Sequence, residues 1–547
     1  MNRCGSDCSR RGEEQPHTAL GELIKRRWTV TRLAALCLLV ACCSLQAQAA
    51  PESVLPAASQ GAKSVRIYPL PQGEPAAPIS ITAGGLPLPG SLCQVSAYPY
   101  NRRWPGHQRT TDQREVAYFA RLAVEGPVTF RYTPARAFSV CTVRPLSAKV
   151  TPTVKDGTIT FTLPRAGGYS VELDGPHNAL HLFLDPPMNY SVSPDAKGVH
   201  YFGAGVHRIG VLQLKDDETV YIDEGAVVYG CIHGDGVHRV RILGRGILDN
   251  SENVEEILRK VDKLGDGSVD VHNCHRKHTI HLINSTDIEI EGITIRDSLC
   301  YNIACFGCSN IAVSNCKIIG CWRYNTDGID LHNCLNARVA GCFVRTYDDS
   351  LCAKGHTGYR YDTCEDILFE NCVIWNDWGK ALEIGAETRA EHLRRIVFRN
   401  CDVIHVTGPA IDIMNVDYGR VHDVLFDDIR IEYDSVIQRP TIQKNDETPF
   451  AADPKSAYMP LTVCFNIHKH PEYSEGLERR GYIYDIKVRN IRIHADRVPP
   501  SSLYGYDEEH AVSDITVDGF FLNDRRINSL EEARFHLGKH TLNVKIQ

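Results

Sequence analysis

The sequence predicts an all-β protein whose main body is a parallel β-helix, a solenoid of short stacked strands. Eight segments share one pattern, a short alternating strand followed by an Asn, Asp or Gly corner, and most recur at steps of 23 to 30 residues, with one step of 62. Strands too short to bury a face alone, recurring at such a period, are typical of stacked coils. The alignment superimposes Ile288, Ile311, Ala337, Ile367, Ile396, Val424, Ile486 and Ile515.

Two columns of cysteine support this alignment. Four cysteines fall five residues after the aligned position, where other coils carry Ile or Phe: Cys316, Cys342, Cys372 and Cys401. The second column, with Leu, Ile or Val in later coils, holds Cys308, Cys334 and Cys364. Because a position shared by Cys and large apolar residues is a core position, we expect buried free thiols there. Disulfides between coils are the alternative, which an exported protein would permit.

The first 50 residues predict a secretory signal peptide. A basic segment precedes a leucine-rich stretch and a small-residue site at Ala47 to Ala49, and the stretch is too short for a membrane span. We therefore expect a secreted or periplasmic protein. The run from Leu39 to Cys42 also resembles a bacterial lipobox, so a lipoprotein anchored through Cys42 is the alternative. No other stretch approaches transmembrane length, and no membrane span is expected.

The rest of the chain divides into a linker, a β-sandwich and the solenoid. Residues 51–62 are rich in Pro, Ala and Ser, which is typical of a linker. Residues 63–190 contain alternating segments separated by Gly, Pro and Asp turns, which predict an antiparallel β-sandwich. Residues 191–547 form the predicted β-helix. The step of 62 residues implies a long loop between Tyr433 and Tyr482.

The C-terminal end of the solenoid is predicted to carry a short helix. Ser529 and Glu532 have the spacing of a capping box, and Gly538 is a stop signal. Such a helix would cover an open end that otherwise presents an unpaired strand edge.

Composition and charge limit the kinds of partner that the protein is expected to bind. A formal net charge of −7 argues against nucleic acid, and 547 residues are enough for two domains and a large core. One cluster suggests zinc, but its spacing fits no closed four-ligand pattern: His272, Cys274, His275 and His278. We expect no metal, no other cofactor, and a monomer.

Three carboxylates occupy comparable places in two successive repeats. Asp327 lies in NTDGIDL, and Asp348 and Asp349 lie in TYDDSLCAKG. When the strands that follow are aligned, Asp327, Asp349 and Lys380 share a column and Asp348 is one step away. Neighbouring coils lie about 4.8 Å apart, so these carboxylates would be close together. Ordinary turn residues are the alternative, since Asp and Asn are common in corners.

Crowded carboxylates suit acid/base chemistry on a sugar chain. An inverting glycosidase needs a carboxylic acid on the leaving oxygen and a carboxylate about 6.5 to 9.5 Å away that activates water. Like charges brought together raise the pKa of one group, which keeps that group protonated as the acid. The expected partner is therefore a polysaccharide substrate.

Several motifs carry a resemblance to known families. The segments NTDGIDL, DDSLCAKG and GKALEIG are similar to motifs of the polygalacturonase family, glycoside hydrolase family 28. The segment YFGAGVH and the later ETVYIDEGAVVYG, which follow the predicted sandwich, resemble the dextranase and isopullulanase family, glycoside hydrolase family 49. The resemblance implies a right-handed, pectin-lyase-like β-helix and an inverting glycosidase that hydrolyses O-glycosyl bonds. It implies Asp348 as general acid, with Asp327 and Asp349 positioning and deprotonating water.

The chain departs from family 28 at the positions that bind a charged sugar. Lys380 replaces the histidine of the family's Gly-His-Gly motif, and Asp412-Ile413-Met414 replaces the Arg-Ile-Lys that grips a galacturonate carboxylate. We therefore expect a neutral or weakly charged polysaccharide. A polygalacturonase acting on pectin is the alternative.

Further residues are predicted to contact the sugar. Aromatic faces suit the apolar faces of pyranose rings, and polar side chains suit hydroxyls. The predicted set is Asn325, Lys354, Lys380, Glu383, Asp412, Trp322 and Trp378. A structural ladder of salt bridges and packing beneath loops are the alternatives. Two other classes of function also remain: a polysaccharide lyase, which would need Ca²⁺ and an Arg or Lys base, and a non-catalytic carbohydrate-binding β-helix.

Overall fold

The structure is a computed structural model that describes residues 64–101, 113–188, 190–253, 278–298, 300–434, 436–443, 448–471, 473–474 and 479–547. These residues belong to one compact unit, Ala62–Gln547. The predicted signal peptide, the linker, Cys42 and three members of the possible zinc cluster (His272, Cys274 and His275) lie outside the described residues. No helix in the described ranges is long and apolar enough to cross a membrane.

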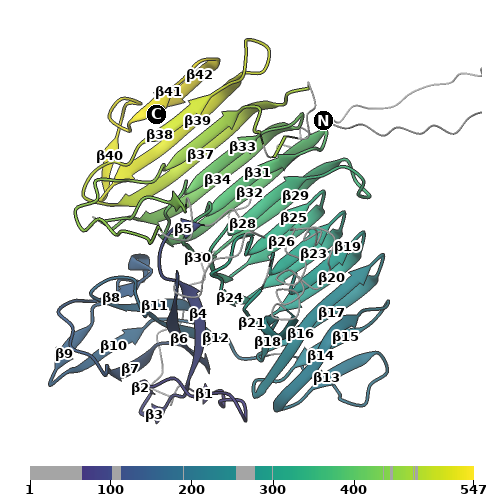
Figure 1. The fold of residues 1–547 in the computed structure, drawn as a ribbon, viewed down its shortest axis with the longest axis vertical. Helices are drawn as coiled ribbons and strands as arrows, with labels where there is room; N and C mark the ends of the chain where they lie inside the picture. The colour runs from purple at the N-terminus through teal and green to yellow at the C-terminus, as the bar shows by residue number, and fades with distance from the viewer. Residues whose placement is uncertain are drawn as a thin grey trace, which may run out of the picture. The chain divides into compact units, whose positions relative to one another are not determined.

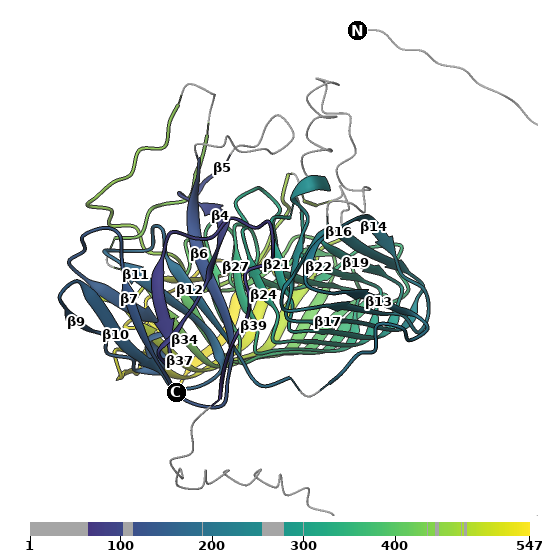
Figure 2. The same ribbon diagram turned by 90° about the horizontal axis from the view of Figure 1, so that it is seen from below.

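Most of the described chain is a parallel β-helix of 29 strands (Figures 1 and 2). Its strands pair with the corresponding strands of the next coil, which arranges them in three columns. The first column contains β19 (Ile280–Ile283), β22 (Ile303–Phe306), β25 (Ile329–His332), β28 (Leu351–Gly355), β31 (Leu382–Thr388), β33 (Ile411–Asn415), β36 (Val463–Ile467), β38 (Ser501–Tyr504) and β41 (Phe535–Leu537).

The other two columns complete each coil. The second column contains β13 (Val199–Phe202), β15 (Thr219–Ile222), β17 (His238–Gly244), β20 (Thr286–Glu291), β23 (Ser309–Ser314), β26 (Leu335–Ala340), β29 (Thr363–Glu370), β32 (His392–His405), β34 (Arg420–Glu432), β37 (Tyr482–His494), β39 (Val512–Leu522) and β42 (Thr541–Ile546). The third contains β14 (Gly205–Gln213), β16 (Ala226–Asp235), β18 (Ile247–Asp249), β21 (Thr294–Arg296), β24 (Lys317–Ile319), β27 (Phe343–Thr346) and β30 (Val373–Asn376). β40 (Arg525–Ile527) pairs antiparallel with β39.

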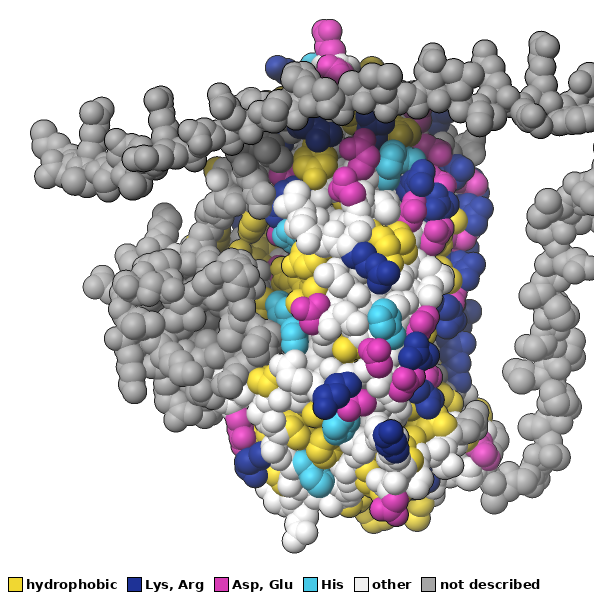
Figure 3. Space-filling model, turned by 90° about the vertical axis from the view of Figure 1, so that its right-hand side faces the viewer, with side chains coloured by type: hydrophobic (Ala, Val, Ile, Leu, Met, Phe, Trp, Pro, Cys, Tyr) yellow, Lys and Arg dark blue, Asp and Glu magenta, His cyan; other side chains and the backbone are white. Residues whose placement is uncertain are grey.

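The predicted repeat is the observed register. All eight aligned positions, from Ile288 to Ile515, pair directly with one another from coil to coil in the second column. The side chains of the two cysteine columns are buried free thiols within the apolar interior, as expected. On the outer surface, acidic and basic side chains are interspersed (Figure 3). Some pair between coils, such as Arg395 with Asp366 at 2.6 Å.

The sandwich consists of two sheets around one core. One sheet has the order β1-β6-β12-β11-β8 with β4 beside β6, and the other has the order β3-β2-β7-β10-β9. Phe130, Phe161 and Leu182 lie in the core between the sheets. The strands are β1 (Val65–Ile67), β2 (Ser80–Ala83), β3 (Leu86–Pro87), β4 (Gly90–Ser96), β6 (Arg114–Val124), β7 (Val128–Thr133), β8 (Cys141–Arg144), β9 (Thr153–Lys155), β10 (Thr158–Leu163), β11 (Gly167–Leu173) and β12 (Leu180–Asp185), with a 3-10 turn η2 (Leu146–Ala148).

One strand pair differs from the predicted antiparallel arrangement of the sandwich. β12 runs parallel to β6, whereas the other pairs in the two sheets are antiparallel. The alternation of a segment predicts that it is a strand, but its partner and direction depend on how the chain crosses between the sheets. The last sandwich strand ends at Asp185 and the first coil strand begins at Val199.

The sandwich packs against the third column of the solenoid. The rings of Phe183 from β12 and Phe343 from β27 lie 5.1 Å apart, within an apolar cluster that also contains Phe119 and Trp375. Lys317 of β24 forms a buried ion pair with Asp185 of β12. The sandwich is therefore fixed to the coils that carry the predicted carboxylates.

The 62-residue step between two repeats differs from the prediction. The segment from Tyr433 to Tyr482 is not simply a loop, because it contains β36, which pairs with β33 and completes a coil. Another part of it, β35 (Thr441–Ile442), pairs with β5 (Tyr100–Asn101). The alignment missed β36 because it followed only the second-column strands, whereas β36 is the first-column strand that precedes β37.

The predicted C-terminal helix is a turn. The capping contact forms, with the Glu532 amide donating to the Ser529 hydroxyl at 3.1 Å. The chain then enters β41 after only a few residues. A single turn has no room to offset the cost of helix nucleation, so the coil strands continue instead.

Candidate active site

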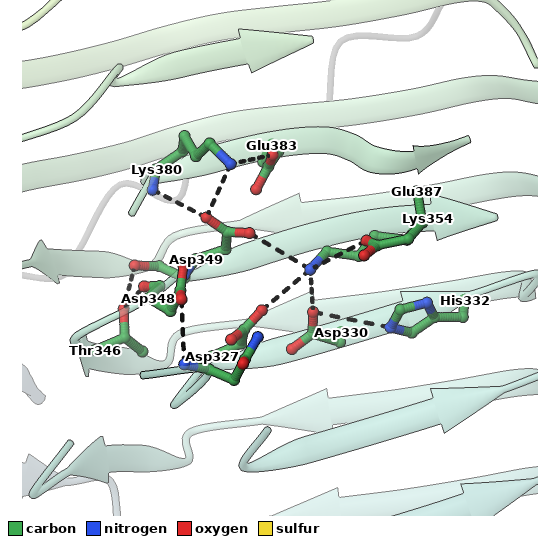
Figure 4. Close-up of polar contacts among 12 residues, drawn as sticks. Asp327, Asp330, His332, Thr346, Asp348, Asp349, Lys354, Lys380, Glu383 and Glu387 are labelled. Atoms are coloured by element: carbon green, nitrogen blue, oxygen red, sulfur yellow. Dashed lines mark hydrogen bonds and ion pairs between the residues drawn. The ribbon is translucent and has the colours of Figure 1, made fainter. Parts of the chain in front are cut away.

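The predicted strand alignment is observed in the first column. Ile329 of β25, Leu351 of β28, Leu382 of β31 and Ile411 of β33 are in register. Asp327, Asp348, Asp349 and Lys380 therefore lie together at the ends of neighbouring strands (Figure 4).

Close backbone packing at these strand ends requires glycine. A Cβ atom on Gly379 would lie 2.6 Å from the Asp349 Oδ1 atom, and one on Gly328 would lie 2.3 Å from the Ser350 carbonyl oxygen. Both distances are shorter than a side chain can adopt without displacing its neighbour. The two glycines therefore allow the turns that carry Asp327 and Asp349 to stack directly.

The turn at Asp348 is held by a network that the sequence did not reveal. The Asn376 side-chain amide donates to the carbonyl oxygens of Asp348 at 2.6 Å and Lys380 at 3.1 Å. The Thr346 hydroxyl also donates to the Asp348 carbonyl oxygen, at 2.6 Å. Asn376 pairs with Thr346 in the third column, but nothing in its local sequence shows that its side chain turns toward the site.

Two backbone donors orient the Asp348 carboxyl group. The amide of Asn325 lies 3.2 Å from its Oδ2 atom, and the amide of Asp349 lies 3.1 Å from its Oδ1 atom. Asn325 adopts a left-handed backbone conformation with φ of 58°. Asn325 therefore lies beside Asp348 through its backbone amide, and its predicted contact with sugar stays a prediction.

Lys354 lies at the centre of the cluster. Its Nζ atom contacts the carboxylate oxygens of Asp327 at 3.0 Å, Asp330 at 3.2 Å and Asp349 at 3.4 Å (Figure 4). Glu387, which the sequence analysis missed, is 3.9 Å away. This one ammonium group therefore links carboxylates from three successive strands of the first column.

Lys380 forms the second cationic contact. Its Nζ atom lies 2.8 Å from the Glu383 Oε1 atom and 3.4 Å from the Asp349 Oδ1 atom. The Asp349 carboxylate is thus placed between two lysines, because Lys354 contacts its other oxygen.

The pKa values of the two adjacent aspartates move in opposite directions. Burial and the neighbouring Asp349 carboxylate raise the pKa of Asp348 to about 7. Burial also acts to raise the pKa of Asp349, but Lys380 and Lys354 outweigh it and hold that pKa well below its usual range. Near neutral pH, Asp348 can therefore carry a proton beside an ionised Asp349.

For four other carboxyls of the cluster, burial outweighs the neighbouring lysines and raises the pKa. It raises the pKa of Asp327 well above its usual range, against the effect of Lys354. It likewise raises the pKa values of Asp330 and Asp412 to about 7 and that of Glu383 further above its usual value. These four carboxyls therefore hold a proton to higher pH than free carboxyls do. At Glu387 the effect of burial is instead outweighed by Lys354 and His356, which lower the pKa.

The polar side chains that were predicted to contact sugar differ in how exposed they are. Lys380 is half-buried beside Asp349, whereas Lys354, Glu383 and Asp412 are at most 2 % exposed. Lys354 pairs with neighbouring aspartates, and Glu383 pairs with Lys380. Glu383 and Asp412 extend an outward column that begins at Asp330. The structure accordingly places these carboxyls beneath the surface, in the arrangement of the salt-bridge alternative.

The aromatic residues divide in the same way. Trp322 is 3 % exposed, with the guanidinium groups of Arg323 and Arg114 at 4.4 and 5.2 Å from its ring centre. Trp378 is half-buried and stacks on Tyr347 at 5.8 Å. Trp378 thus stays near the site with a partly accessible ring, while Trp322 is packed.

Tyr473 is a residue near the site that the sequence analysis missed. Its hydroxyl lies 3.1 Å from the hydroxyl of Tyr324, the residue that precedes Asn325. Tyr473 belongs to the long segment after β36, about 150 residues further along the chain, so no local signal links the two.

The carboxylates have spacings that could also suit a cation. Oxygen and sulfur atoms of Asp327, Asp330 and Cys352 lie within 4.8 Å of one another. The ammonium of Lys354 already contacts both carboxylates of this group. The positive charge at this position is therefore supplied by the protein.

Comparisons with known proteins show which families this chain is similar to. The model of the glycosyl hydrolases family 28 matches residues 210–445. A dextranase of Arthrobacter sp. (strain CB-8) is 25 % identical over 270 residues, which cover 47 % of this chain and 37 % of the dextranase. A probable polygalacturonase of Vitis vinifera is 32 % identical over 217 residues, covering 40 % and 32 % of the two chains. The matched regions thus span about a third of each relative.

The fold comparison extends over more of the chain. Dex49A from Penicillium minioluteum superimposes with a TM-score of 0.52 at 13 % identity, covering 88 % of this chain and 96 % of that structure. This similarity confirms the predicted right-handed parallel β-helix. The predicted resemblance to both glycosidase families is also confirmed. Residues 210–445 therefore match the glycosyl hydrolases family 28, in a chain that also shares similarity with dextranases.

Proposed function

We propose that this protein is an inverting glycoside hydrolase that cleaves a polysaccharide. The carrying observation is the adjacent pair formed by Asp348, whose pKa is raised to about 7, and Asp349, whose pKa is held low. Neighbouring carboxyls with separated pKa values provide an acid and an anion at the same pH. Asp348 would protonate the glycosidic oxygen, and Asp327 with Asp349 would position and deprotonate the water.

The proposed substrate is neutral or weakly charged. Asp412 and Met414 occupy the positions of the family's basic clamp. The ammonium groups of Lys354 and Lys380 already contact protein carboxylates, so neither is an uncompensated partner for a sugar carboxylate. The similarity to a dextranase supports the same substrate class, because dextran is an uncharged glucan.

A polygalacturonase acting on pectin is the second candidate. The family 28 match and the similarity to a probable polygalacturonase favour it. Lys380 could serve this function if it exchanged Glu383 for a substrate carboxylate.

A polysaccharide panel separates these possibilities. Purified protein is incubated with dextran, galactan and polygalacturonate, and new reducing ends, ultraviolet absorbance of unsaturated products and the anomer of the first product are measured. We expect reducing ends of inverted configuration, with kcat/KM highest on a neutral polymer. A preference for polygalacturonate would overturn the neutral substrate. An unsaturated product would show a lyase, and binding without cleavage would show a carbohydrate-binding protein.

We further propose that the protein acts outside the cytoplasm as a monomer. The support is the signal-like sequence of residues 1–50, with Cys42 as the alternative lipid attachment site. Cell fractionation, labelling with a fatty acid and the Cys42→Ser variant test the location and the anchor. Gel filtration tests the monomer. Retention of the full-length chain in the cytoplasm would contradict export.

A further inference from the structure

Resting on the proposed function, we propose a division of labour within the water-activating pair. Asp327 alone takes the proton from water, and Lys354 is the positioning residue that orients Asp327 and favours its ionised form. Asp349 does not exchange a proton during the reaction but remains a fixed anion between two lysines.

The hydrogen-bonding capacity of the two carboxylates carries this assignment. The Oδ2 atom of Asp327 contacts the Lys354 ammonium at 3.0 Å. Its Oδ1 atom is buried and has no hydrogen-bond partner among the described residues. A buried acceptor without a partner costs free energy until a donor reaches it, so this oxygen is the open position for a water molecule.

Asp349 has no comparable open oxygen. Its Oδ2 atom contacts the Lys354 ammonium at 3.4 Å. Its Oδ1 atom contacts the Lys380 ammonium at 3.4 Å and accepts the Lys380 backbone amide at 3.2 Å. Both oxygens are thus held by donors that would have to move before Asp349 could bind water.

The same geometry places Lys354 as the cation in contact with the proposed base. Burial raises the pKa of Asp327, and Lys354 opposes this effect. Nearby carboxyls act in the same direction as burial. The titratable groups that face Asp327 or Lys354 are Asp330, Asp348, Asp349, Glu383, Glu387, Tyr301, Tyr324, Cys352 and His332.

The reaction then balances with these groups alone. The water oxygen bonds to the anomeric carbon as Asp327 Oδ1 takes one water proton. The bond from that carbon to the glycosidic oxygen breaks, and Asp348 gives its proton to the departing oxygen. Asp327 ends protonated and Asp348 ionised, so a proton must return between them, or through solvent, before the next cycle.

The first test compares two buried lysines. Lys354→Met and the control Lys317→Met each remove a buried ammonium that pairs with aspartate, but Lys317 lies at the contact with the sandwich. The profile of kcat/KM against pH is measured on the panel polysaccharide that the wild type cleaves fastest. In Lys354→Met, the acidic limb should move to higher pH by about 1 to 3 units, because an adjacent cation lowers a carboxyl pKa by that much.

The basic limb should move in the same direction by less, because Lys354 also lowers the pKa of Asp348 from further away. Lys317→Met should lower the melting temperature and leave both limbs in place. An active Lys354→Met enzyme with unshifted limbs would overturn the role of Lys354.

The second test remains informative if Lys354→Met does not fold. Azide can attack the anomeric carbon without giving up a proton, so it bypasses a missing base but not other losses. Asp327→Ala with sodium azide should regain part of the roughly 10²- to 10⁴-fold contribution of general base catalysis and form a glycosyl azide. Asp349→Ala should show no such recovery.

Recovery in Asp349→Ala, or its absence in a folded Asp327→Ala, would overturn the division of labour. These results differ from failure of the proposed function itself. In that case the wild-type protein would cleave no member of the panel, and neither comparison could begin.

Discussion

The strands of the first column have an inner face that packs in the apolar core and an outer face that carries polar groups of the candidate site. On the inner face, Ile329, Leu351, Leu382 and Ile411 stack in the apolar core. On the outer face of the same strands lie Asp330, Cys352, Glu383 and Asp412, in register one residue further along. A shift of one residue along a strand therefore separates the groups that stabilise the coil from those around the chemistry.

The difference shows how a regular scaffold can hold an irregular charge cluster. The inner face needs only apolar groups of suitable size, and its stability increases with every coil added. The outer face and the adjoining strand ends bury at least six carboxyls around two lysines, and this burial, together with the neighbouring carboxylates, raises most of their pKa values. We infer that the stability of the inner stack compensates for this unfavourable crowding.

The largest expected effect is on the outer face. Asp348→Asn removes the proposed acid and should lower kcat by about 10²- to 10⁴-fold with little change in melting temperature. Asp377→Asn is the matched control. The Asp377 carboxylate accepts a hydrogen bond of 2.7 Å from the Trp375 indole N–H and has no proposed part in the reaction. The control should keep most of its turnover. Turnover near the wild-type value in Asp348→Asn would refute the acid assignment.

An inner-face substitution should have the reverse pattern. Leu351→Ala removes a fully buried side chain and should lower the free energy of unfolding by about 2 to 5 kcal/mol. Chemical denaturation measures this loss. The activity of the folded fraction, assayed well below the melting temperature, should stay within a few fold of wild type. A loss of turnover as large as that of Asp348→Asn would show that the two faces are not separable.

The pH dependence of kcat/KM should depend on the carboxyl groups of the candidate site and not on the apolar inner face. Because Asp348 must be protonated to act as the acid and its pKa is about 7, kcat/KM should fall as the pH rises above about 7. The fall should approach tenfold per pH unit. Leu351→Ala should reproduce the wild-type profile. A rate that stays constant to pH 9 would contradict the assignment of Asp348 as the titrating acid.

The smallest expected effect concerns the interior cysteines. Cys372→Ala removes one buried sulfur from a column of thiols and should cost about 1 kcal/mol, similar to one buried methylene. Thiol titration of unfolded protein without reductant should find Cys316, Cys342, Cys372 and Cys401 reactive. Disulfides at these positions in a peptide map would show that the interior is held covalently.

Much of the scaffold was predictable because each coil pairs with the next, so the spacing of strands in the sequence determines which residues lie side by side. The period of the strands placed Ile288 through Ile515 in one column, and the same counting placed Asp327, Asp349 and Lys380 at adjacent strand ends. Alternation also identified the cysteines as interior, because a shift of one residue would have exposed the whole apolar set.

The tertiary structure alone decided which side chains meet across coils. Lys354 was expected to contact sugar, but its side chain instead lies among Asp327, Asp330 and Asp349. Asn376 reaches the turn at Asp348 through its side chain, and β36 completes a coil inside an expected loop. Periodicity determines backbone position, whereas these contacts depend on side-chain direction, burial and long-range pairing, for which the local pattern contains no signal.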